Sequence, residues 1–164
     1  MKNKEQKFKK VYEQSKDKIH RLCLGFMGNK TDADDLFQEI LIKVWNNLNT
    51  FRNESSIDTW IYRITTNTAL LTLNRKTKLN KKEIDYQPNI PHYEIENLNS
   101  TDKEQEVKKL YKAISSLKEI DRIIIGLLLE NCSYDEISNI TGLKTSNVGV
   151  RINRIKKTLS KKLK

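Results

Sequence analysis

The chain has 164 residues, enough for one ordinary domain or two small ones, and its formal charge of +10 at pH 7 favours polyanionic partners such as nucleic acid. No apolar run approaches the roughly 20 residues that a membrane span requires, and the start MKNKEQKFKK lacks the apolar core of a secretion signal. The chain has two cysteines, which are too few for a disulfide framework or a four-ligand zinc site. Composition therefore predicts a cytoplasmic protein with no metal, no cofactor and no direct membrane insertion.

Charge and periodicity divide the sequence into two helical parts and an acidic segment between them. Residues 83–106 carry seven acidic groups and one basic group, contain both prolines and show no sustained periodicity. The flanking parts have few glycines and repeat Leu or Ile at three and four positions. We therefore predict an all-α protein of two small helical domains, residues 1–82 and 107–164, joined by a flexible linker. That linker is either a solvated tether or an acidic strand that occupies a basic channel of a partner.

Apolar residues at helical spacing predict the first two helices. The first helix ends at Gly28 and Asn29, and its buried face holds Phe8, Tyr12, Ser15, Ile19, Leu22 and Phe26. Thr31 is expected to cap the second helix, whose buried side holds Ala33, Leu36, Phe37, Ile40, Val44 and Leu48.

The other side of the second helix combines carboxylates with apolar residues. Its outward members are Asp35, Gln38, Ile42 and Trp45, next to Glu39 and Asn46. Carboxylates gain nothing from contact with nucleic acid, whereas a basic protein surface with an apolar centre would complement this face. The helix macrodipole would account for Asp32 and Asp34, but it leaves Ile42 and Trp45 unexplained. This face is therefore predicted to bind another protein.

A third helix, within FRNESSIDTWIYRITTNTALLTLNRK, is predicted to carry both core residues and nucleic-acid-binding residues. Its core stripe is Ile57, Trp60, Ile61, Ile64 and Leu71. Beside that stripe lie Arg63, Asn67, Leu70 and Asn74, and the basic residues Arg75, Lys76, Lys78, Lys81 and Lys82 extend the surface. Amides and positive charge together make this helix a candidate for nucleic-acid binding.

The C-terminal part has the pattern of a helix-turn-helix. Ser133 and Glu136 form a capping box, and Gly142 ends the short helix that begins there. Thr145 is expected to cap the next helix, whose apolar side holds Val148, Ile152, Ile155 and Leu159.

The opposite face of this last helix combines hydrogen-bonding groups with positive charge. It holds Ser146, Asn147, Val150, Asn153, Arg154 and Lys157, with Arg151 at its margin and Lys144 just before it. No carboxylate follows Gly142. Such a face suits the base edges and phosphates of a major groove. A basic, solvated helix that closes a bundle is the alternative.

Three segments, in this order, resemble parts of the extracytoplasmic-function sigma factors of bacterial RNA polymerase. DADDLFQEILIKVW is similar to their core-binding segment, FRNESSIDTWIYRITTNTAL to their promoter-melting segment and SYDEISNITGLKTSNVGVRINRIKK to their upstream-promoter segment. The resemblance covers nearly all of residues 8–163 apart from the linker. It implies a specificity subunit, not an enzyme, that recognises the −35 and −10 promoter elements and helps to melt the promoter.

The resemblance also implies roles for individual residues. A coiled coil on the polymerase clamp would contact Asp34, Asp35, Gln38, Glu39 and Ile42. The single-stranded −10 element, with one base flipped into a pocket, would contact Phe51, Arg52, Asn53, Ser55, Ser56, Arg63, Asn67, Asn74, Arg75 and Lys76. The duplex −35 element would contact Lys144, Thr145, Ser146, Asn147, Arg151, Arg154 and Lys157.

The resemblance implies further partners, and the sequence differs from the family pattern in two places. The resemblance implies the polymerase flap as a second contact, a linker directed toward the RNA exit path, and an inhibitory anti-sigma factor. Gly149 and Val150 stand where relatives commonly carry Arg-Ser, and Leu71, Asn74 and Arg75 stand where relatives often carry a polar residue and two arginines. The promoter preferences of the family are therefore not transferred to this chain.

Two other functions fit parts of the sequence. A stand-alone helix-turn-helix regulator would bind its operator without polymerase and use the N-terminal helices to dimerise. An enzyme acting on nucleic acid is a more distant alternative, because His20 and His92 have no Cys or Asp at ligand spacing and no nucleophile dyad accompanies the basic surfaces.

Overall fold

The computed structural model describes residues 2–82 and 101–164, and every regular element in these two ranges is helical. The elements are α1 (Lys2–Met27), α2 (Lys30–Asn47), the 3-10 turn η1 (Leu48–Thr50), α3 (Ile57–Lys82), α4 (Asp102–Ser115), α5 (Glu119–Leu129), α6 (Tyr134–Thr141) and α7 (Thr145–Lys162). The prediction of an all-α protein is confirmed. The predicted linker reached residue 106, whereas α4 begins at Asp102; residues 83–100 lie outside the described ranges.

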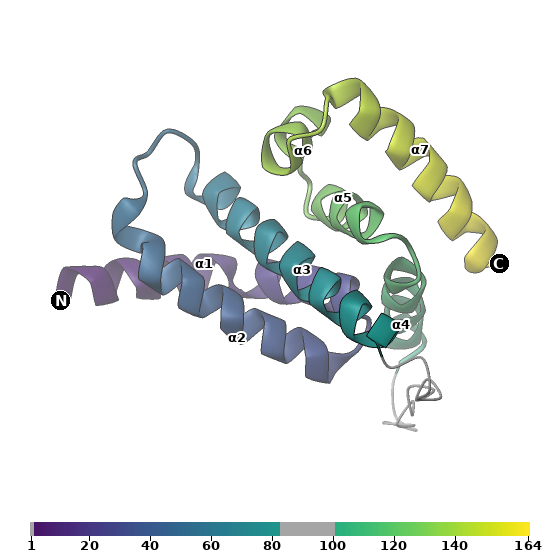
Figure 1. Ribbon diagram of the computed structural model, residues 1–164, viewed down its shortest axis with the longest axis horizontal. Coiled ribbons are helices and arrows are strands. Elements are labelled where there is room, and N and C mark those ends of the chain that lie inside the picture. The colour runs from purple at the N-terminus through teal and green to yellow at the C-terminus, as the bar shows by residue number, and fades with distance from the viewer. Residues whose placement is uncertain (1, 83–100) are drawn as a thin grey trace.

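The helices form two lobes, an N-terminal lobe of α1–α3 and a C-terminal lobe of α4–α7 (Figure 1). Helix α1 ends as predicted, because Gly28 has the positive φ of +79° that glycine adopts at no steric cost. Asn29 then caps α2, since its side chain accepts a hydrogen bond of 2.8 Å from the backbone N–H of Asp32. The prediction that Thr31 caps this helix was wrong. The cap lies two residues earlier, where the extended backbone after Gly28 already allows it.

Of the core stripe predicted for α3, Ile61 is buried and Ile57, Trp60 and Ile64 pack against the core, so only Leu71 departs from the prediction. Leu71 was assigned to the core but is 49% exposed. Small and polar side chains fill the buried positions along this helix, namely Thr65, Thr66, Thr68 and Ala69, together with Ile61, Tyr62 and Leu73. The hydroxyl groups of Thr65 and Thr68 donate to carbonyls one turn earlier at 2.9 and 2.7 Å, so they need no water. The buried side of α3 therefore includes threonines that a search for apolar residues does not select.

The helix-turn-helix of α6 and α7 is present as predicted. The Ser133 side chain accepts from the Glu136 backbone, and the Glu136 carboxylate accepts from the Ser133 backbone, which is the predicted capping box. Gly142 ends α6 with a φ of +80°. The prediction that Thr145 caps α7 was wrong, because the cap position is Lys144. Thr145 instead donates to Asp135 at 3.1 Å, which fastens the start of α7 to the start of α6.

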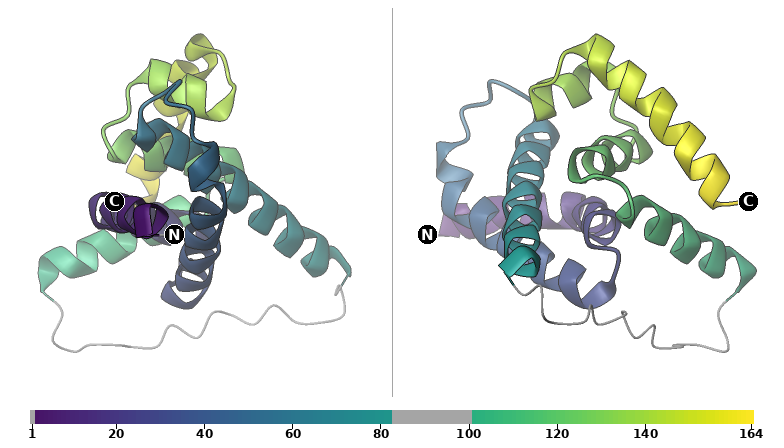
Figure 2. Two further views of the ribbon diagram at one scale, coloured as in Figure 1. Left: turned by 90° about the vertical axis from the view of Figure 1, so that its left-hand side faces the viewer. Right: turned by 45° about the vertical axis from the view of Figure 1, so that its right-hand side comes forward.

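The two lobes pack directly against each other and share one hydrophobic core (Figures 1 and 2). Helix α1 contacts α2 and α3 within its own lobe and α4 and α5 of the other lobe. Glycines permit this close approach: a Cβ atom at Gly126 would lie 3.0 Å from Leu22 Cδ2, and one at Gly28 would lie 2.5 Å from the Ser115 side chain. The sequence predicted both lobes but did not predict their contact.

Polar contacts reinforce the interface between the lobes. Arg21 on α1 binds Glu130 with two hydrogen bonds of 2.7 and 2.9 Å, and the Glu130 side chain is only 8% exposed. Arg122 on α5 donates to the backbone carbonyl of Phe26 at 2.8 Å. A buried carboxylate held by a bidentate guanidinium is a strong, directional contact. The interface therefore has a defined geometry as well as an apolar centre.

Candidate nucleic-acid and polymerase interfaces

The acidic and apolar face predicted on α2 is present and lies on the surface. Asp35 and Gln38 are exposed, and Ile42 is 60% exposed one turn further along. Asp34 accepts a 3.0 Å contact from His20, and Glu39 pairs with Lys43 at 3.6 Å, so these two carboxylates are partly engaged within the lobe. The free part of the face therefore centres on Asp35, Gln38 and Ile42.

The prediction that Trp45 projects outward was wrong. Its ring meets the ring of Phe8 edge to face with centroids 5.3 Å apart, and the Lys4 ammonium lies 4.5 Å from the ring centroid. These contacts half-bury the indole against the first turns of α1. Ile42, and not Trp45, is therefore the main exposed apolar residue of this face.

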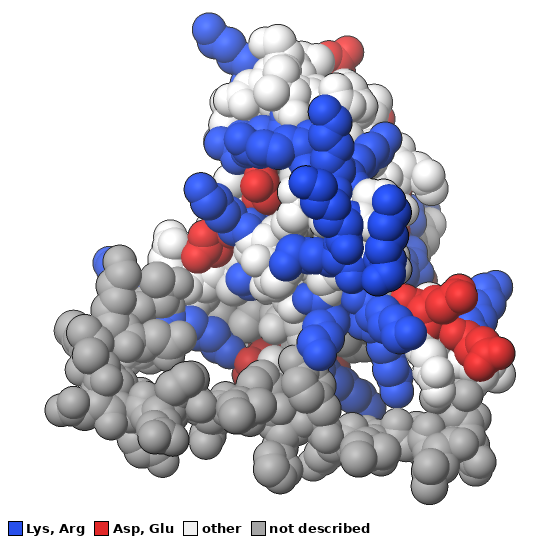
Figure 3. Space-filling view, turned by 90° about the vertical axis from the view of Figure 1, so that its right-hand side faces the viewer, with Lys and Arg blue, Asp and Glu red and all other residues white. Residues whose placement is uncertain are grey.

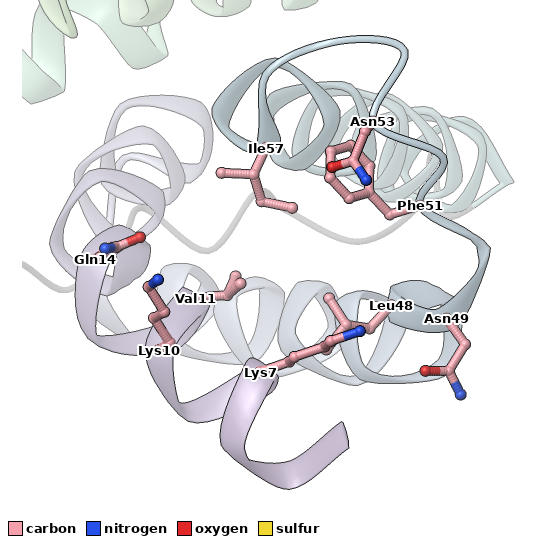
Figure 4. A pocket seen from close by; sticks show the side chains of 9 residues that line it. All are labelled: Lys7, Lys10, Val11, Gln14, Leu48, Asn49, Phe51, Asn53 and Ile57. Carbon is pink, nitrogen blue, oxygen red and sulfur yellow. The ribbon is translucent and has the colours of Figure 1, made fainter. Parts of the chain in front are cut away.

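The loop between η1 and α3 covers an open cavity of about 500 Å³. Its floor is apolar, and its rim carries amides and two ammonium groups (Figure 4). The lining residues are Lys7, Lys10, Val11 and Gln14 from α1, Leu48 and Asn49 from η1, Phe51 and Asn53 from the loop, and Ile57 from α3. The Phe51 and Trp60 rings, 5.3 Å apart, hold the start of the loop against α3. Such a cavity can accept a flat apolar group with an anionic group beside it.

Lys7 and Lys10 were not among the residues predicted to bind nucleic acid. The sequence offered only one signal for them, the excess of lysine near the start of α1. The sequence could not show that these lysines line the same cavity as Phe51 and Asn53, because only the packing of α1 against η1 brings the two segments together.

Along α3, some of the residues predicted to bind nucleic acid are exposed, and others contact side chains or backbone of neighbouring helices. Asn67, Asn74 and Arg75 are exposed. Arg63 is also exposed, but its Nε donates to the backbone carbonyl of Asn139 on α6 at 3.3 Å. Lys76 pairs with Asp32 of α2 at 2.6 Å. Burial raises the pKa of Asp32, yet the hydrogen bond from Asn29 and the Lys76 ammonium outweigh burial and hold this pKa below its usual value.

The predicted duplex-binding face of α7 is exposed at most positions, with Arg151 as the exception. Lys144, Ser146, Asn147, Arg154 and Lys157 are exposed, and so is Thr145, which bonds Asp135. Arg151 is half-buried: its Nη1 pairs at 2.9 Å with Asp121 of α5, which is 7% exposed, and its Nε donates to the Asn147 side chain at 3.3 Å. Arg154 keeps 60% of its side chain exposed at 3.8 Å from the same carboxylate.

Positive charge gathers on the side of the molecule where the chain ends (Figure 3). Basic residues continue along α7 as Arg154, Lys156, Lys157, Lys161 and Lys162, and no acidic residue follows Gly142. A surface with one sign of charge attracts polyanions over distances comparable with the Debye length. The geometry thus provides three surfaces that could bind partners: the acidic and apolar face of α2, the cavity lined by α1, η1 and the following loop, and the basic face of α7.

Comparison with known proteins identifies the family. Residues 11–79 match the Sigma-70 region 2 family, and residues 108–159 match the Sigma-70 region 4 family. The chain is 30% identical over 141 residues to the ECF RNA polymerase sigma-E factor of Escherichia coli K12, covering 80% of this chain and 74% of that protein. The chain belongs to the extracytoplasmic-function (ECF) sigma factors. A second relative of this sigma factor is SigW of Bacillus subtilis, 29% identical over 181 residues and covering 96% of this chain and 89% of SigW.

Solved structures share the fold of this sigma factor. The sigma factor RpoE of Bartonella quintana, solved in complex with the anti-sigma factor NepR, superposes with a TM-score of 0.78 at 19% identity and covers 96% of both chains. CnrH, solved with the cytosolic domain of CnrY, gives a TM-score of 0.67 at 18% identity over 95% of this chain and 86% of that chain. Both likenesses extend over the two lobes.

Within residues 2–82 and 101–164, no group of three His, Cys, Asp or Glu side chains is placed to hold a metal ion. None of the helices in those ranges is long and apolar enough to cross a membrane. Both thiols are buried, and burial is the main cause that raises the pKa of Cys23 to about 12 and that of Cys132 to about 11.

Proposed function

We propose that this sigma factor binds core RNA polymerase through the exposed face of α2 and brings both lobes to promoter DNA. The observation that carries the proposal is the separation of surfaces: Asp35, Gln38 and Ile42 lie on α2, while the basic reading face lies on α7. Carboxylates around an exposed isoleucine complement a basic protein surface with an apolar centre, such as the polymerase clamp. The protein would act in the cytoplasm, where its polymerase and promoters are, and an anti-sigma factor would be a further partner.

The N-terminal lobe is proposed to hold the single-stranded −10 element. The cavity under the Phe51–Ser56 loop offers an apolar floor, side-chain amides and the Lys7 and Lys10 ammonium groups to one unstacked nucleotide. Asn67 and Asn74 on the exposed side of α3 would contact neighbouring bases. Removing a base from the stack costs a few kcal/mol, and binding the flipped base offsets that cost without any nucleotide hydrolysis.

The C-terminal lobe is proposed to hold the −35 element as duplex. Helix α7 is the second helix of the helix-turn-helix, the one that such motifs place in the major groove. Residues at its N-terminal end would contact base edges, and its lysines would contact phosphates. Arg154 is free enough to reach a base edge, whereas Arg151 is fastened to Asp121 and supports the helix. We therefore assign base or phosphate contact to Arg154 and a positioning role to Arg151.

Simultaneous binding of both elements requires the lobes to separate. Elements centred at −35 and −10 lie about 25 base pairs apart, or about 85 Å along the duplex at 3.4 Å per pair. The longest helices, α1 and α3, have 26 residues each and so are about 39 Å long. Two lobes that share one core cannot span that separation. Residues 83–100 add a reach of at most about 65 Å once the lobes part.

Run-off transcription tests the proposal directly. Purified core polymerase would be incubated with a library of genomic promoter fragments, with and without the chain. A set of transcripts that depends on the chain is expected. Identical transcripts with and without the chain, or binding of the chain to an operator without polymerase, would contradict the proposal and favour a stand-alone regulator.

A further inference from the structure

Val150 is an exposed apolar side chain in the middle of the polar face of α7. It is 66% exposed, whereas the other valine and isoleucines of the helix, Val148, Ile152 and Ile155, are at most 1% exposed. A single exposed apolar residue needs no explanation on an ordinary surface. This one differs by its surroundings, because Asn147 precedes it by one turn and Arg154 follows it by one turn on the same face.

The residues next to Val150 in the sequence do not cover it. Val148 points into the core, and Gly149 has no side chain. A Cβ atom at Gly149 would lie 3.5 Å from the Tyr134 ring, so this side of α7 packs against α6. Arg151 is drawn back to Asp121 of α5 at 2.9 Å. The isopropyl group of Val150 is therefore open to a surface that approaches this face of α7, between the exposed Asn147 and Arg154.

The polar neighbours of Val150 differ in how firmly they are held. Arg151 Nε donates to Asn147 Oδ1 at 3.3 Å, so the Asn147 carbonyl is engaged and its NH₂ group remains to donate outward. Arg154 lies 3.8 Å from the second oxygen of Asp121 and keeps 60% of its side chain exposed, so its guanidinium can still reach outward. Successive turns of this face thus present the Asn147 amide donor, the apolar Val150 side chain and the Arg154 cation.

We propose that Val150 is a specificity-determining residue that reads the 5-methyl group of a thymine in the upstream duplex. The inference rests on the proposed function, which places α7 in a major groove. The thymine methyl is the apolar group that the major-groove edge of an unmodified base pair presents. An isopropyl group can pack on that methyl, whereas it would bury the N4 amino group of cytosine or the N6 amino group of adenine without a hydrogen-bond partner.

Removing the methyl group from DNA without other change tests the inference. The probe is a promoter duplex recovered with holoenzyme from the run-off library, in which each upstream thymine is replaced in turn by deoxyuridine. At one position this replacement should weaken binding of wild-type holoenzyme about fourfold, the ratio that corresponds to about 0.8 kcal/mol for one buried methyl-sized group. Holoenzyme with Val150→Ala should bind the thymine and deoxyuridine duplexes equally.

A matched control and a second probe sharpen the result. Leu163→Ala truncates another exposed apolar side chain, directly after the end of α7, and this variant should retain the full response to deoxyuridine. If cytosine replaces thymine at the sensitive position, 5-methylcytosine there should bind wild-type holoenzyme better than cytosine, and Val150→Ala should not distinguish the two.

The outcomes separate this inference from the proposed function. Recovery of chain-dependent promoters whose binding ignores deoxyuridine at every upstream position would overturn the role of Val150 and leave the sigma-factor assignment standing. A deoxyuridine effect that persists in Val150→Ala would do the same. Failure of the library to yield any chain-dependent promoter would overturn the proposed function and this inference together.

Discussion

Individual lysines on α1 acquire a role only through the residues that lie opposite them. Lys7 and Lys10 line the cavity beneath the Phe51–Ser56 loop, and a nucleotide bound there would place its phosphate near both ammonium groups. Replacing both by alanine should weaken binding of a single-stranded −10 oligonucleotide to holoenzyme. The slope of log affinity against log salt should fall by about 0.7, because both lysines share one phosphate and each phosphate contact to a single strand contributes about that much.

Fluorescence anisotropy across a range of NaCl concentrations would measure that slope. Lys2→Ala with Lys9→Ala is the matched control, since it removes two exposed lysines from the same helix that do not line the cavity. An unchanged slope in the Lys7 and Lys10 variant would remove these residues from the proposed single-strand site.

The two arginines near Asp121 are expected to differ in what their loss affects. Arg154→Ala should weaken binding of the upstream duplex by roughly 1–3 kcal/mol, as for a lost base or charged contact, with little change in stability. Arg151→Ala leaves the buried Asp121 without its closest cation, so it should lower the free energy of unfolding by about 1–3 kcal/mol. Urea unfolding and promoter titration of both variants measure these effects. If Arg154→Ala lowered stability and Arg151→Ala weakened only DNA binding, the roles assigned to the two arginines would be refuted.

At the level of helices, the sequence predicted most of what local chemistry determines. The capping box at Ser133, the ends of α1 and α6 at glycine, and the apolar side of α7 follow from short-range patterns. Patterns failed where tertiary packing decides. Leu71 is apolar yet exposed, whereas Thr65, Thr66 and Thr68 are polar yet buried.

Two glycines with nearly the same backbone angle offer a test of how the helices meet. Gly28 and Gly142 have φ values of +79° and +80°, so alanine at either position should cost about 1–2 kcal/mol in backbone strain. At Gly28 the added Cβ would also lie 2.5 Å from the Ser115 side chain in the other lobe, whereas at Gly142 it meets nothing within 4 Å. Gly28→Ala should therefore destabilise the protein more than Gly142→Ala in thermal or urea unfolding. Equal losses would argue that the lobes are not packed this way in solution.

For the whole molecule, the closed arrangement of the lobes is the feature that the sequence did not predict. The sequence predicted the apolar face of α1, but a pattern does not say which element covers that face. The fit depends on Gly126 beneath Leu22 and on the Arg21–Glu130 pair, whose members are far apart in the sequence. The predicted site residues were limited in the same way, since Lys7 and Lys10 join the loop only in three dimensions.

Cys132 should report the separation of the lobes. It is 5% exposed and lines a small cavity at the interface with Tyr62 and Asp58 of the other lobe, and burial is the main cause that raises its pKa to about 11. Arg21→Ala leaves the buried Glu130 carboxylate unpaired, so the interface should open more often and Cys132 should be alkylated faster. Iodoacetamide labelling followed by mass spectrometry measures the rate. Cys23, which is fully buried, is the internal control, and an unchanged Cys132 rate would show that this pair does not hold the lobes together.

The central claim is that the exposed face of α2 docks onto core RNA polymerase, and co-purification of polymerase with variants of the chain tests it most directly. Asp35→Lys with Glu39→Lys reverses the charge of this face, and Glu104→Lys with Glu106→Lys makes the same change in charge on exposed positions of α4. The account predicts that the α2 variant loses core polymerase while keeping its helical content, and that the α4 variant still binds. Full binding by the α2 variant would contradict it.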